Sequence, residues 1–468
     1  MTKKITHLAL ALITLLTGCS MIPTYERPAA PVPTGFPNVA ASESPATLPS
    51  WRTYFAEPRL QQLIELALNN NRDLRIASLN VEQARAQFQV RRAAQYPAVG
   101  LAANASHAPA SGTGNITNNF SVGLAVTAWE LDFFGRVASL KEQALAQYLA
   151  TEEGRNAAQV SLISSVANGW LNLLADEELL ELSRRTLATR EESVRLTKLR
   201  LDSGAASELD YRQAESLAQA ARATLAQQQR QRALDENALA LLLGQPLPED
   251  IRATLGRSDL NAAPAMQTVP AGLPSDLLVQ RPDIRQAEQQ LIAANANIGA
   301  ARAAFFPRIS LTAQAGTTSG ELSGLFKNGS WGFTLAPSLL LPLFDAGANQ
   351  ANLESAQASR GVAVAQYEKA IQTAFREVAD ALASQSSLTE QLEAQRKQAE
   401  AESIRFKLAD LRYQNGVASY LDLLDAQRSL FSSQQGVVQV RLSQLQNQVS
   451  LFKALGGGWT DETTSAKP

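Results

Sequence analysis

The chain has 468 residues, more than one compact core accommodates, so two or three structural regions are expected. Its net charge of −2 offers no electrostatic attraction to nucleic acid, which is therefore not an expected partner. With two histidines and one cysteine, the composition excludes a disulfide and a zinc site, and no catalytic residue, metal or cofactor is predicted.

The N-terminus has the features of a bacterial lipoprotein signal peptide. The basic start MTKK is followed by the apolar run Leu8–Leu16, which is too short to span a bilayer as a helix. The tetrapeptide LTGC at 16–19 resembles a lipobox, in which the cysteine is acylated and becomes the first mature residue. Residues 1–18 are therefore predicted to be a signal peptide and Cys19 a covalent lipid anchor. The resemblance implies outer-membrane sorting, because Ser20 follows the cysteine rather than an aspartate.

Two proline-rich segments are predicted to connect the folded parts. Residues 19–58, which begin at the acylated N-terminus, contain eight prolines and predict an extended strap. Residues 245–281 are predicted to be a proline-rich linker in an equatorial region, and residues 460–468 a C-terminal tail.

The chain contains two copies of one unit. Residues 71–103 align with 281–313 at a constant offset of 210, and from Gly135 onward the offset is 212. Two repeats are therefore predicted, over 59–244 and 282–459.

Each repeat contains two segments in which apolar and polar residues alternate, as they do in a β-strand with two different faces. Helical stretches that end at Pro97 and Pro307 precede them. The strands are predicted over about 98–107, 118–132, 307–317 and 331–343. About ten residues is the length of a tilted transmembrane strand, but four strands cannot close a barrel and open edges are costly in lipid. Several chains must share one barrel, and the periodicity does not choose between two, three and four copies.

The rest of each repeat is predicted to be helical. Residues 135–203 form one pattern of about 65 residues, near 100 Å long, and residues 207–243 form its antiparallel return. Apolar side chains recur every seven residues along the long helices, which predicts a coiled-coil seam rather than a buried globular helix. The seam consists of Leu180, Leu187, Val194 and Leu201 in the first repeat and of Leu392, Ala399, Phe406 and Tyr413 in the second.

Three segments carry a family resemblance: residues 272–313, residues 365–383 and the motif LGGGW at 455–459. With the lipobox and the duplication, they resemble the TolC-like outer-membrane factor family, in its NodT-type efflux lipoprotein branch and closest to the OprM-type multidrug efflux channels. The resemblance implies an α+β membrane protein. A homotrimer shares a twelve-stranded transmembrane antiparallel β-barrel, four strands per protomer, and a long coiled α-helical barrel in the periplasm.

The same resemblance implies a function. The chain is expected to be the passive exit duct of a tripartite efflux pump for drugs and other small toxic compounds, lodged in the outer membrane and contacting its lipid. Its expected partners are a periplasmic adaptor (membrane fusion protein) and an inner-membrane resistance–nodulation–division transporter. Enzymatic activity is not expected.

Two nearly identical stretches, RLDSGAASELDYRQAE at 200–215 and RYQNGVASYLDLLDAQ at 412–427, mark the expected gate. Gly204 and Gly416 are predicted to turn the two long helical hairpins at the end farthest from the strands. The turn occurs twice because each protomer supplies two hairpins.

Leu421 and Asp425 are four residues apart and share one helix face. By family resemblance they point into the lumen of the closed end, where three leucines would form an apolar constriction and three aspartates a ring that favours cations. Asp422, Asp210 and Arg212 are further gate candidates, the last two through pairing across hairpins. The alternative is that these charges only solvate an exposed turn.

Two other functions remain open from the residues. A type I secretion duct would use the same architecture for protein cargo. A trimeric coiled-coil structural protein or adhesin would explain the seven-residue repeat, although such proteins usually carry their membrane strands at one terminus.

Overall fold

The computed structural model describes residues 20–36, 49–109, 116–256, 260, 266 and 280–458. The predicted signal peptide, Cys19 and the C-terminal tail lie outside these residues. The chain divides into two compact units, the first made of residues 1–30, 78–154 and 283–370 and the second of residues 31–77, 155–282 and 371–468.

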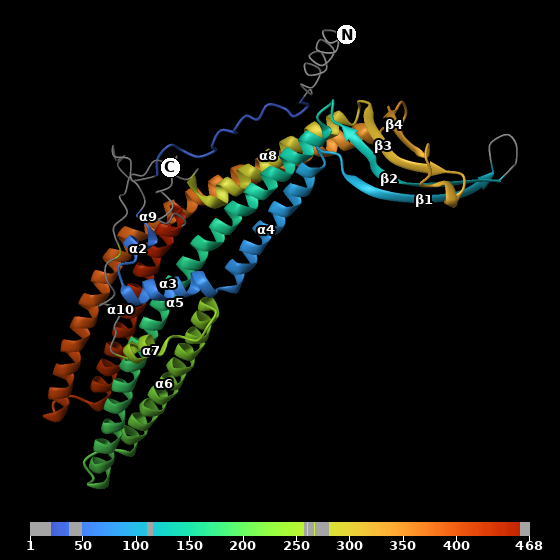
Figure 1. Ribbon diagram of the computed structural model, residues 1–468. Helices are drawn as coiled ribbons and strands as arrows, with labels where there is room; N and C mark the ends of the chain where they lie inside the picture. Colours follow the sequence, from blue (N-terminus) through green and yellow to red (C-terminus); the bar gives the residue numbers. More distant parts are fainter. Residues whose placement is uncertain are drawn as a thin grey trace. The chain divides into compact units, whose positions relative to one another are not determined.

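The first unit contains one antiparallel sheet of four strands in the order β1-β2-β3-β4 (Figure 1). The strands are β1 (Val99–Pro109), β2 (Ile116–Leu131), β3 (Arg308–Ser319) and β4 (Trp331–Leu340). The two hairpins therefore join through β2 and β3, and β1 and β4 are edges. β4 ends three residues before the predicted limit of 343, because Leu340 pairs with Arg308 and the preceding Pro307 has no N–H to continue the ladder.

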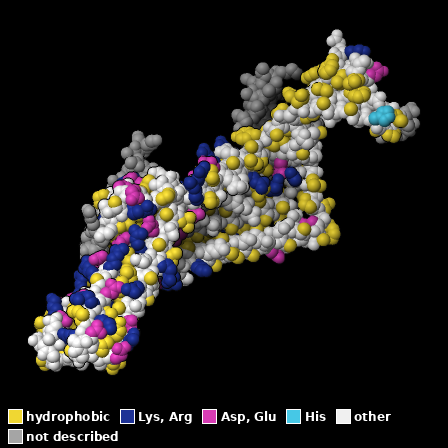
Figure 2. Space-filling model, turned by 90° about the horizontal axis from the view of Figure 1, so that it is seen from below, with side chains coloured by type: hydrophobic (Ala, Val, Ile, Leu, Met, Phe, Trp, Pro, Cys, Tyr) yellow, Lys and Arg dark blue, Asp and Glu magenta, His cyan; other side chains and the backbone are white. Residues whose placement is uncertain are grey.

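The two faces of the sheet differ, as the alternation predicted. Hydrophobic side chains gather over the strands of this unit in the space-filling view (Figure 2). Trp331, Phe333, Leu335 and Leu339 of β4 are each more than half exposed. Exposed aromatic and aliphatic residues on one face of a sheet indicate a surface that meets an apolar environment.

The N-terminal residues 20–30 pack against helix α8 (Pro282–Ala303) within the same unit. Arg27 donates from Nε and Nη2 to the two carboxylate oxygens of Glu288, at 2.7 and 2.9 Å, and the Tyr25 hydroxyl donates to Glu288 at 3.0 Å. The amide of Asn295 donates to the carbonyl of Pro23 at 2.7 Å. Residues 20–30 are thus held by a two-pronged ion pair.

The second unit holds the main hydrophobic core. Short helices α2 (Trp51–Tyr54), α3 (Pro58–Asn70) and α7 (Glu249–Leu255) pack there with parts of the long helices. Tyr54 stacks on Phe452 with ring centroids 4.1 Å apart, and Trp170 donates its indole N–H to Glu57 at 3.0 Å. The extended strap predicted over 19–58 therefore differs from the structure near its end, where Ser50 caps α2 and the aromatic side chains are buried. The linker predicted over 245–281 likewise contains α7.

The remaining helices match the predicted lengths closely. α4 spans Arg72–Ala93, α5 Arg136–Asp202, α6 Glu208–Leu243, α9 Ala348–Gln414 and α10 Tyr420–Ala454. Along α5 and α9, all eight residues of the predicted seam are buried or half-buried, in agreement with a narrow packing stripe. None of the helices in the described part of the chain combines the length and the apolar composition that a membrane-spanning helix needs.

A buried carboxyl group lies between α5 and α6 in the second unit. Asp176 is 6% exposed, and burial, followed by a hydrogen bond that its protonated carboxyl donates to the side chain of Asp235, raises its pKa to about 7. Glu177 adds to the increase and Arg232 opposes it; these two residues pair with each other at 2.5 Å.

We predict that Asp176 makes the helical region less stable at pH 8.5 than at pH 5.5. A carboxyl group whose pKa is raised on folding stabilises the folded state fully below its unfolded pKa, and this contribution is lost as the pH rises through about 7. Asp176→Asn should remove this dependence and raise the stability at pH 8.5 by about 2–4 kcal/mol. Thermal melts followed by circular dichroism measure it. Asp202→Asn, at an exposed position of α5, is the matched control, and an unchanged pH slope in Asp176→Asn would contradict the prediction.

Candidate functional site

Both helical hairpins of the second unit turn through the same glycine geometry. Gly204 has a φ of 75° and Gly416 a φ of 70°, in the left-handed region that glycine adopts without strain. The N–H of Gly204 donates to the carbonyl of Leu201 at 2.9 Å, and that of Ala205 to Arg200 at 2.7 Å. The second hairpin repeats the pattern, with Gly416 bonded to Tyr413 at 3.1 Å and Val417 to Arg412 at 2.9 Å. Both predicted turns therefore have the same helix-ending motif.

The acidic residues after each turn begin the returning helix. Ser207 and Asp210 form a capping box, in which each backbone N–H donates to the other side chain at 3.1 Å. Ser419 and Asp422 form the same box at 3.2 Å. Asp210 and Asp422, predicted as gate residues, therefore satisfy orphan N–H groups at the start of α6 and α10.

Asp425 pairs across its own hairpin. Arg405 of α9 donates from Nη2 to the Asp425 carboxylate, and Arg428 lies 3.6 Å from it on α10. The Asp425 side chain is 46% exposed, and Leu421, one turn before it, is 63% exposed. The predicted leucine and aspartate thus share an exposed face, but the aspartate is charge-compensated. Arg405 was missed by sequence reasoning; the available signal was that residues 405 and 425 lie at similar distances from Gly416, 11 before it and 9 after it, on the two helices of an antiparallel hairpin.

Arg212 is bound within its own helix in the single chain. It donates to Glu208 at 2.8 Å and to Glu215 at 2.8 Å, and both pairs are exposed. Pairs of this kind stabilise a helix only slightly. The predicted pairing of Asp210 and Arg212 across hairpins is not among the contacts of the single chain.

The two hairpins pack on each other near their turns. Tyr420, Leu423 and Leu424 of α10 form a small buried cluster with Ala214 of α6. The guanidinium of Arg200 lies 4.8 Å from the centre of the Tyr413 ring, which joins the end of α5 to the end of α9. A cavity of about 540 Å³ beside this cluster is lined from α5, α9 and α10. A small cluster, one cation–π contact and a cavity make a loosely packed hairpin end.

Arg190 is a second link between the hairpins. Its guanidinium is mostly buried, donates to the carbonyl of Leu217 at 3.1 Å, and lies 5.7 Å from the centre of the Phe431 ring. Burial, followed by repulsion from Arg428, lowers the Arg190 pKa.

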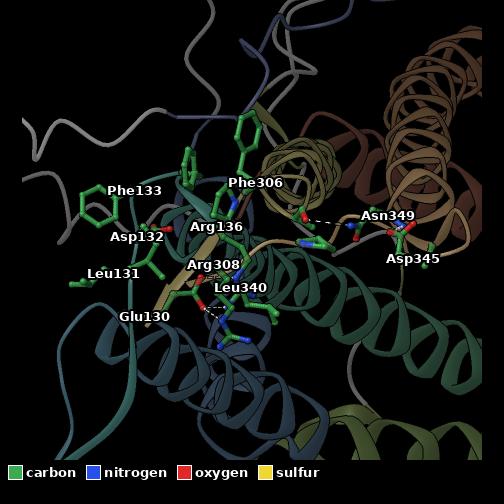
Figure 3. A pocket seen from close by; sticks show the side chains of 17 residues that line it. Glu130, Leu131, Asp132, Phe133, Arg136, Phe306, Arg308, Leu340, Asp345 and Asn349 are labelled. Carbon is green, nitrogen blue, oxygen red and sulfur yellow. Dashed lines mark hydrogen bonds and ion pairs between the residues drawn. The ribbon is translucent and has the colours of Figure 1, made fainter. Parts of the chain in front are cut away.

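In the first unit, an ionic cluster fixes the junction between strands and helices (Figure 3). Glu130 at the end of β2 accepts hydrogen bonds from Arg136 of α5 at 2.8 and 2.6 Å, and pairs with Arg308 of β3 at 2.7 Å. Phe134 stacks on Phe306 with centroids 4.9 Å apart. The cluster borders a cavity of about 340 Å³.

Two aspartates cap the long helices at this junction. Asp132 accepts from the N–H groups of Val137 and Ala138 at the start of α5, at 3.1 and 2.7 Å. Asp345 accepts from Gly347 and Asn349 before and in α9, at 3.0 and 2.9 Å. An acid at a helix N-terminus satisfies free N–H groups and the helix dipole together.

Comparison with known proteins agrees with this architecture. A family model described as Outer membrane efflux protein matches residues 63–245 and 273–457. Probable efflux pump outer membrane protein TtgC of Pseudomonas putida is 46% identical over 483 residues, spanning 100% of this chain and 98% of the relative. Solvent efflux pump outer membrane protein SrpC of Pseudomonas putida is 47% identical over 470 residues, spanning 98% of this chain and 99% of the relative. The open-state MtrE outer membrane channel of Neisseria gonorrhoeae superposes with a TM-score of 0.85 at 41% identity, covering 94% of this chain and 99% of that one.

A duplicated, helix-rich chain with four strands that leave two edges open defines an outer-membrane channel subunit. The chain belongs to the outer membrane efflux protein family. The predicted family, fold class and outer-membrane location are confirmed. The relatives reported above are named as efflux-pump outer-membrane proteins and as a channel rather than as enzymes.

The capping boxes generate a prediction that separates capping from gating. Asp422→Ala and Ser419→Ala remove the two halves of one box, so each should destabilise the start of α10 by about 0.5–2 kcal/mol. Hydrogen–deuterium exchange of residues 420–423 should speed up equally in both variants, and Asp210→Ala should do the same at the start of α6. If Asp422→Ala changes channel conductance while Ser419→Ala does not, capping is not the main role of Asp422.

Proposed function

We propose that three copies of this chain form one channel, the passive exit duct of a tripartite efflux pump, and that the turns of the helical hairpins form its periplasmic gate. The observation that carries the proposal is the four-stranded sheet with two open edges in a chain of this family. Closing the edges requires other copies, and three copies give twelve strands. The helices continue the duct into the periplasm as a coiled barrel.

The partners follow from the same role. A passive duct has no energy source, so an inner-membrane resistance–nodulation–division transporter supplies it and a periplasmic adaptor joins the two. Several relatives are named for the efflux of antibiotics, solvents or toluene, which supports small toxic compounds as the cargo. None of these names describes protein secretion or adhesion. The duct itself uses no metal, cofactor or enzymatic step, and a lipid on Cys19 adds membrane retention.

The gate is assigned to the second hairpin. Leu421 exposes 63% of its surface in the single chain, which is costly for an apolar residue unless other copies cover it. Three such leucines around an axis form an apolar ring that closes by excluding water. Asp425 lies one turn further along. At about 6 Å two carboxylates repel by about 1–3 kcal/mol, and the Arg405 guanidinium on each Asp425 offsets this repulsion. Three copies of Asp425 can therefore lie close together in the closed periplasmic gate without destabilising it.

Leu421→Ala tests the constriction, and with it the channel itself. Alanine keeps the helix but removes most of the apolar side chain, so the ring should wet and the single-channel conductance should rise severalfold in planar bilayers. Cells should become permeable to vancomycin-sized molecules without the pump. Leu209→Ala is the comparison variant, because Leu209 occupies the equivalent place in the first hairpin and is 65% exposed, and a larger effect of Leu421→Ala is expected if the second hairpin carries the constriction. If Leu421→Ala and wild type have the same conductance, this turn is not the gate. Absence of any channel in wild type would remove the function.

The ion selectivity of the channel tests the role of the Arg405–Asp425 pair. Arg405→Gln leaves Asp425 without its main counter-charge, so reversal potentials should shift toward cations. Asp425→Asn removes the negative charge that faces Arg405 and Arg428 and leaves Arg405 paired with Glu402 at 3.1 Å, so the shift should be toward anions. Lys397→Gln removes a cation from an exposed pair with Glu393 on the same helix α9 and should change selectivity less. Shifts of the same sign in both variants, or none, would show that this pair does not line the conducting path.

A further inference from the structure

The cavity of about 540 Å³ near the hairpin turns takes its walls from both hairpins, and the proposed gate makes no use of it. Helix α5 of the first hairpin forms one side, and α9 and α10 of the second form the other. Pockets of this size hold small organic molecules in many proteins. The chemistry of the lining therefore indicates which kind of molecule fits.

Three aromatic rings line the cavity. Phe406 and Tyr413 are half-buried on α9, and Tyr420 at the start of α10 is 6% exposed. The ring centroids of Tyr413 and Tyr420 lie 5.3 Å apart, and the rings are tilted by 45°. The guanidinium of Arg200 lies 4.8 Å from the centre of the Tyr413 ring, so one of these rings already contacts a cation. Such rings favour an occupant that is itself aromatic, cationic or both.

The polar groups of the lining are mostly hydrogen-bond acceptors. The hydroxyls of Thr189, Ser193 and Thr197 each donate to a carbonyl one turn earlier in α5, so toward a ligand they can only accept. Two further groups have no hydrogen bond of ordinary geometry: the Tyr420 hydroxyl, which lies beside Thr197, and Oε1 of Gln427. A buried polar group without a partner is costly, and a donor on a ligand would satisfy it.

One carboxylate of the lining has no ion pair among the described residues. The cavity is bordered by two acids, Glu192 and Asp410. Glu192 pairs with Arg195 on the same helix at 2.5 Å. Asp410 accepts from the amide of Gln414 at 2.8 Å, and in the described part of the chain no cation pairs with it. Asp410 is thus the acid that is available to a positively charged ligand.

We propose that this cavity binds a small aromatic amine in its protonated form. The N–H groups of the amine donate to Asp410 and to the unpartnered acceptors, and its rings pack against the three aromatic side chains. An aromatic anion would meet the Asp410 carboxylate and a lining of acceptors, with Arg200 as its one counter-charge. An uncharged hydrocarbon would leave the acceptors unsatisfied.

The site belongs to one combination of helices. At the offset of 212, Phe406, Asp410, Tyr413 and Tyr420 correspond to Val194, Lys198, Leu201 and Glu208. The first repeat therefore has no aromatic ring at these four positions, and a lysine stands where the second repeat has Asp410. A cavity built with the roles of the two repeats exchanged would not take the same ligand.

A bound amine should hold the two hairpin ends together. Because the walls come from both hairpins, a ligand that fills the cavity favours the arrangement of the hairpins in this structure over any other. The site itself depends only on the described hairpin ends, whereas its effect on a channel rests on the function proposed above.

Fluorescence titration with ethidium tests the site on the purified full chain in dodecyl maltoside. Ethidium is a planar aromatic cation with two amino groups, and its fluorescence rises in apolar surroundings. Wild type should bind it saturably, and Asp410→Asn should raise the dissociation constant about tenfold. Leu196→Trp fills the cavity from a position that is 47% exposed and should abolish binding. Asp202→Asn removes an acid near the same turn but outside the lining, and as the matched control it should bind like wild type.

Two further measurements test the charge of the ligand and the link between the hairpins. The aromatic anion 1-anilinonaphthalene-8-sulfonate should bind more weakly than ethidium, and Asp410→Asn should not weaken it further. Saturating ethidium should slow hydrogen–deuterium exchange of residues 196–203 and 410–417 together.

The outcomes separate this site from the proposed channel. Equal ethidium affinity in wild type, Asp410→Asn and Leu196→Trp overturns the site, and tighter binding of the sulfonate overturns the assignment to a cation. Protection of one hairpin alone overturns the link between them. A wild type that conducts in planar bilayers but binds no ethidium overturns the site and leaves the channel in place. A wild type that binds ethidium as expected but forms no channel removes the proposed function and leaves the site.

Discussion

The open edges of a four-stranded sheet are the constraint on which the rest of the molecule depends. In lipid each unpaired N–H or C=O group costs several kcal/mol, and β1 and β4 together present two full rows of them. A single chain cannot meet this cost, so the membrane part is stable only in a closed ring of identical contacts. The strands must then leave the helices at a fixed angle in every copy. Glu130, held by Arg136 and Arg308, and the helix caps Asp132 and Asp345 provide that rigidity.

The hairpin ends have the opposite character. Their contacts are a small apolar cluster, the Arg200–Tyr413 contact and half-exposed ion pairs such as Arg405–Asp425. Exposed ion pairs contribute little to stability, and the adjoining cavity of about 540 Å³ leaves room for rearrangement. Such an end can change conformation at a small cost in free energy. The capping boxes and left-handed glycines hold each hairpin together by local hydrogen bonds that do not involve the other hairpin.

Local patterns predicted most of the fold, because they are written in neighbouring residues. The alternation of apolar and polar residues predicted the strands, and Pro97 and Pro307 predicted where the preceding helices end. The seven-residue spacing predicted the packing stripe along the long helices. Helix α2 was missed inside a proline-rich segment, because its aromatic side chains are buried by Phe452, far away in sequence. Distance in sequence also hid Glu130–Arg308, whereas Arg405 and Asp425 are only 20 residues apart and were open to prediction from the hairpin. The helix caps were predictable from the sequence, because Ser207 and Ser419 each precede an aspartate by three residues, which is the spacing of a capping box.

The two repeats have diverged at their hairpin ends. Leu421 has a counterpart in the first hairpin, Leu209, and both are exposed to nearly the same degree, 63% and 65%. Asp425 has none, since residue 213 is a glutamine, and Arg405 corresponds to Ser193. The apolar element of the hairpin end is therefore duplicated while its charge pair is confined to the second repeat. At the strands, the Glu130–Arg308 ion pair joins β2 of the first repeat to β3 of the second within one chain. Each of these two ionic clusters thus belongs to one place in the chain, Glu130–Arg308 between the repeats and Arg405–Asp425 within the second.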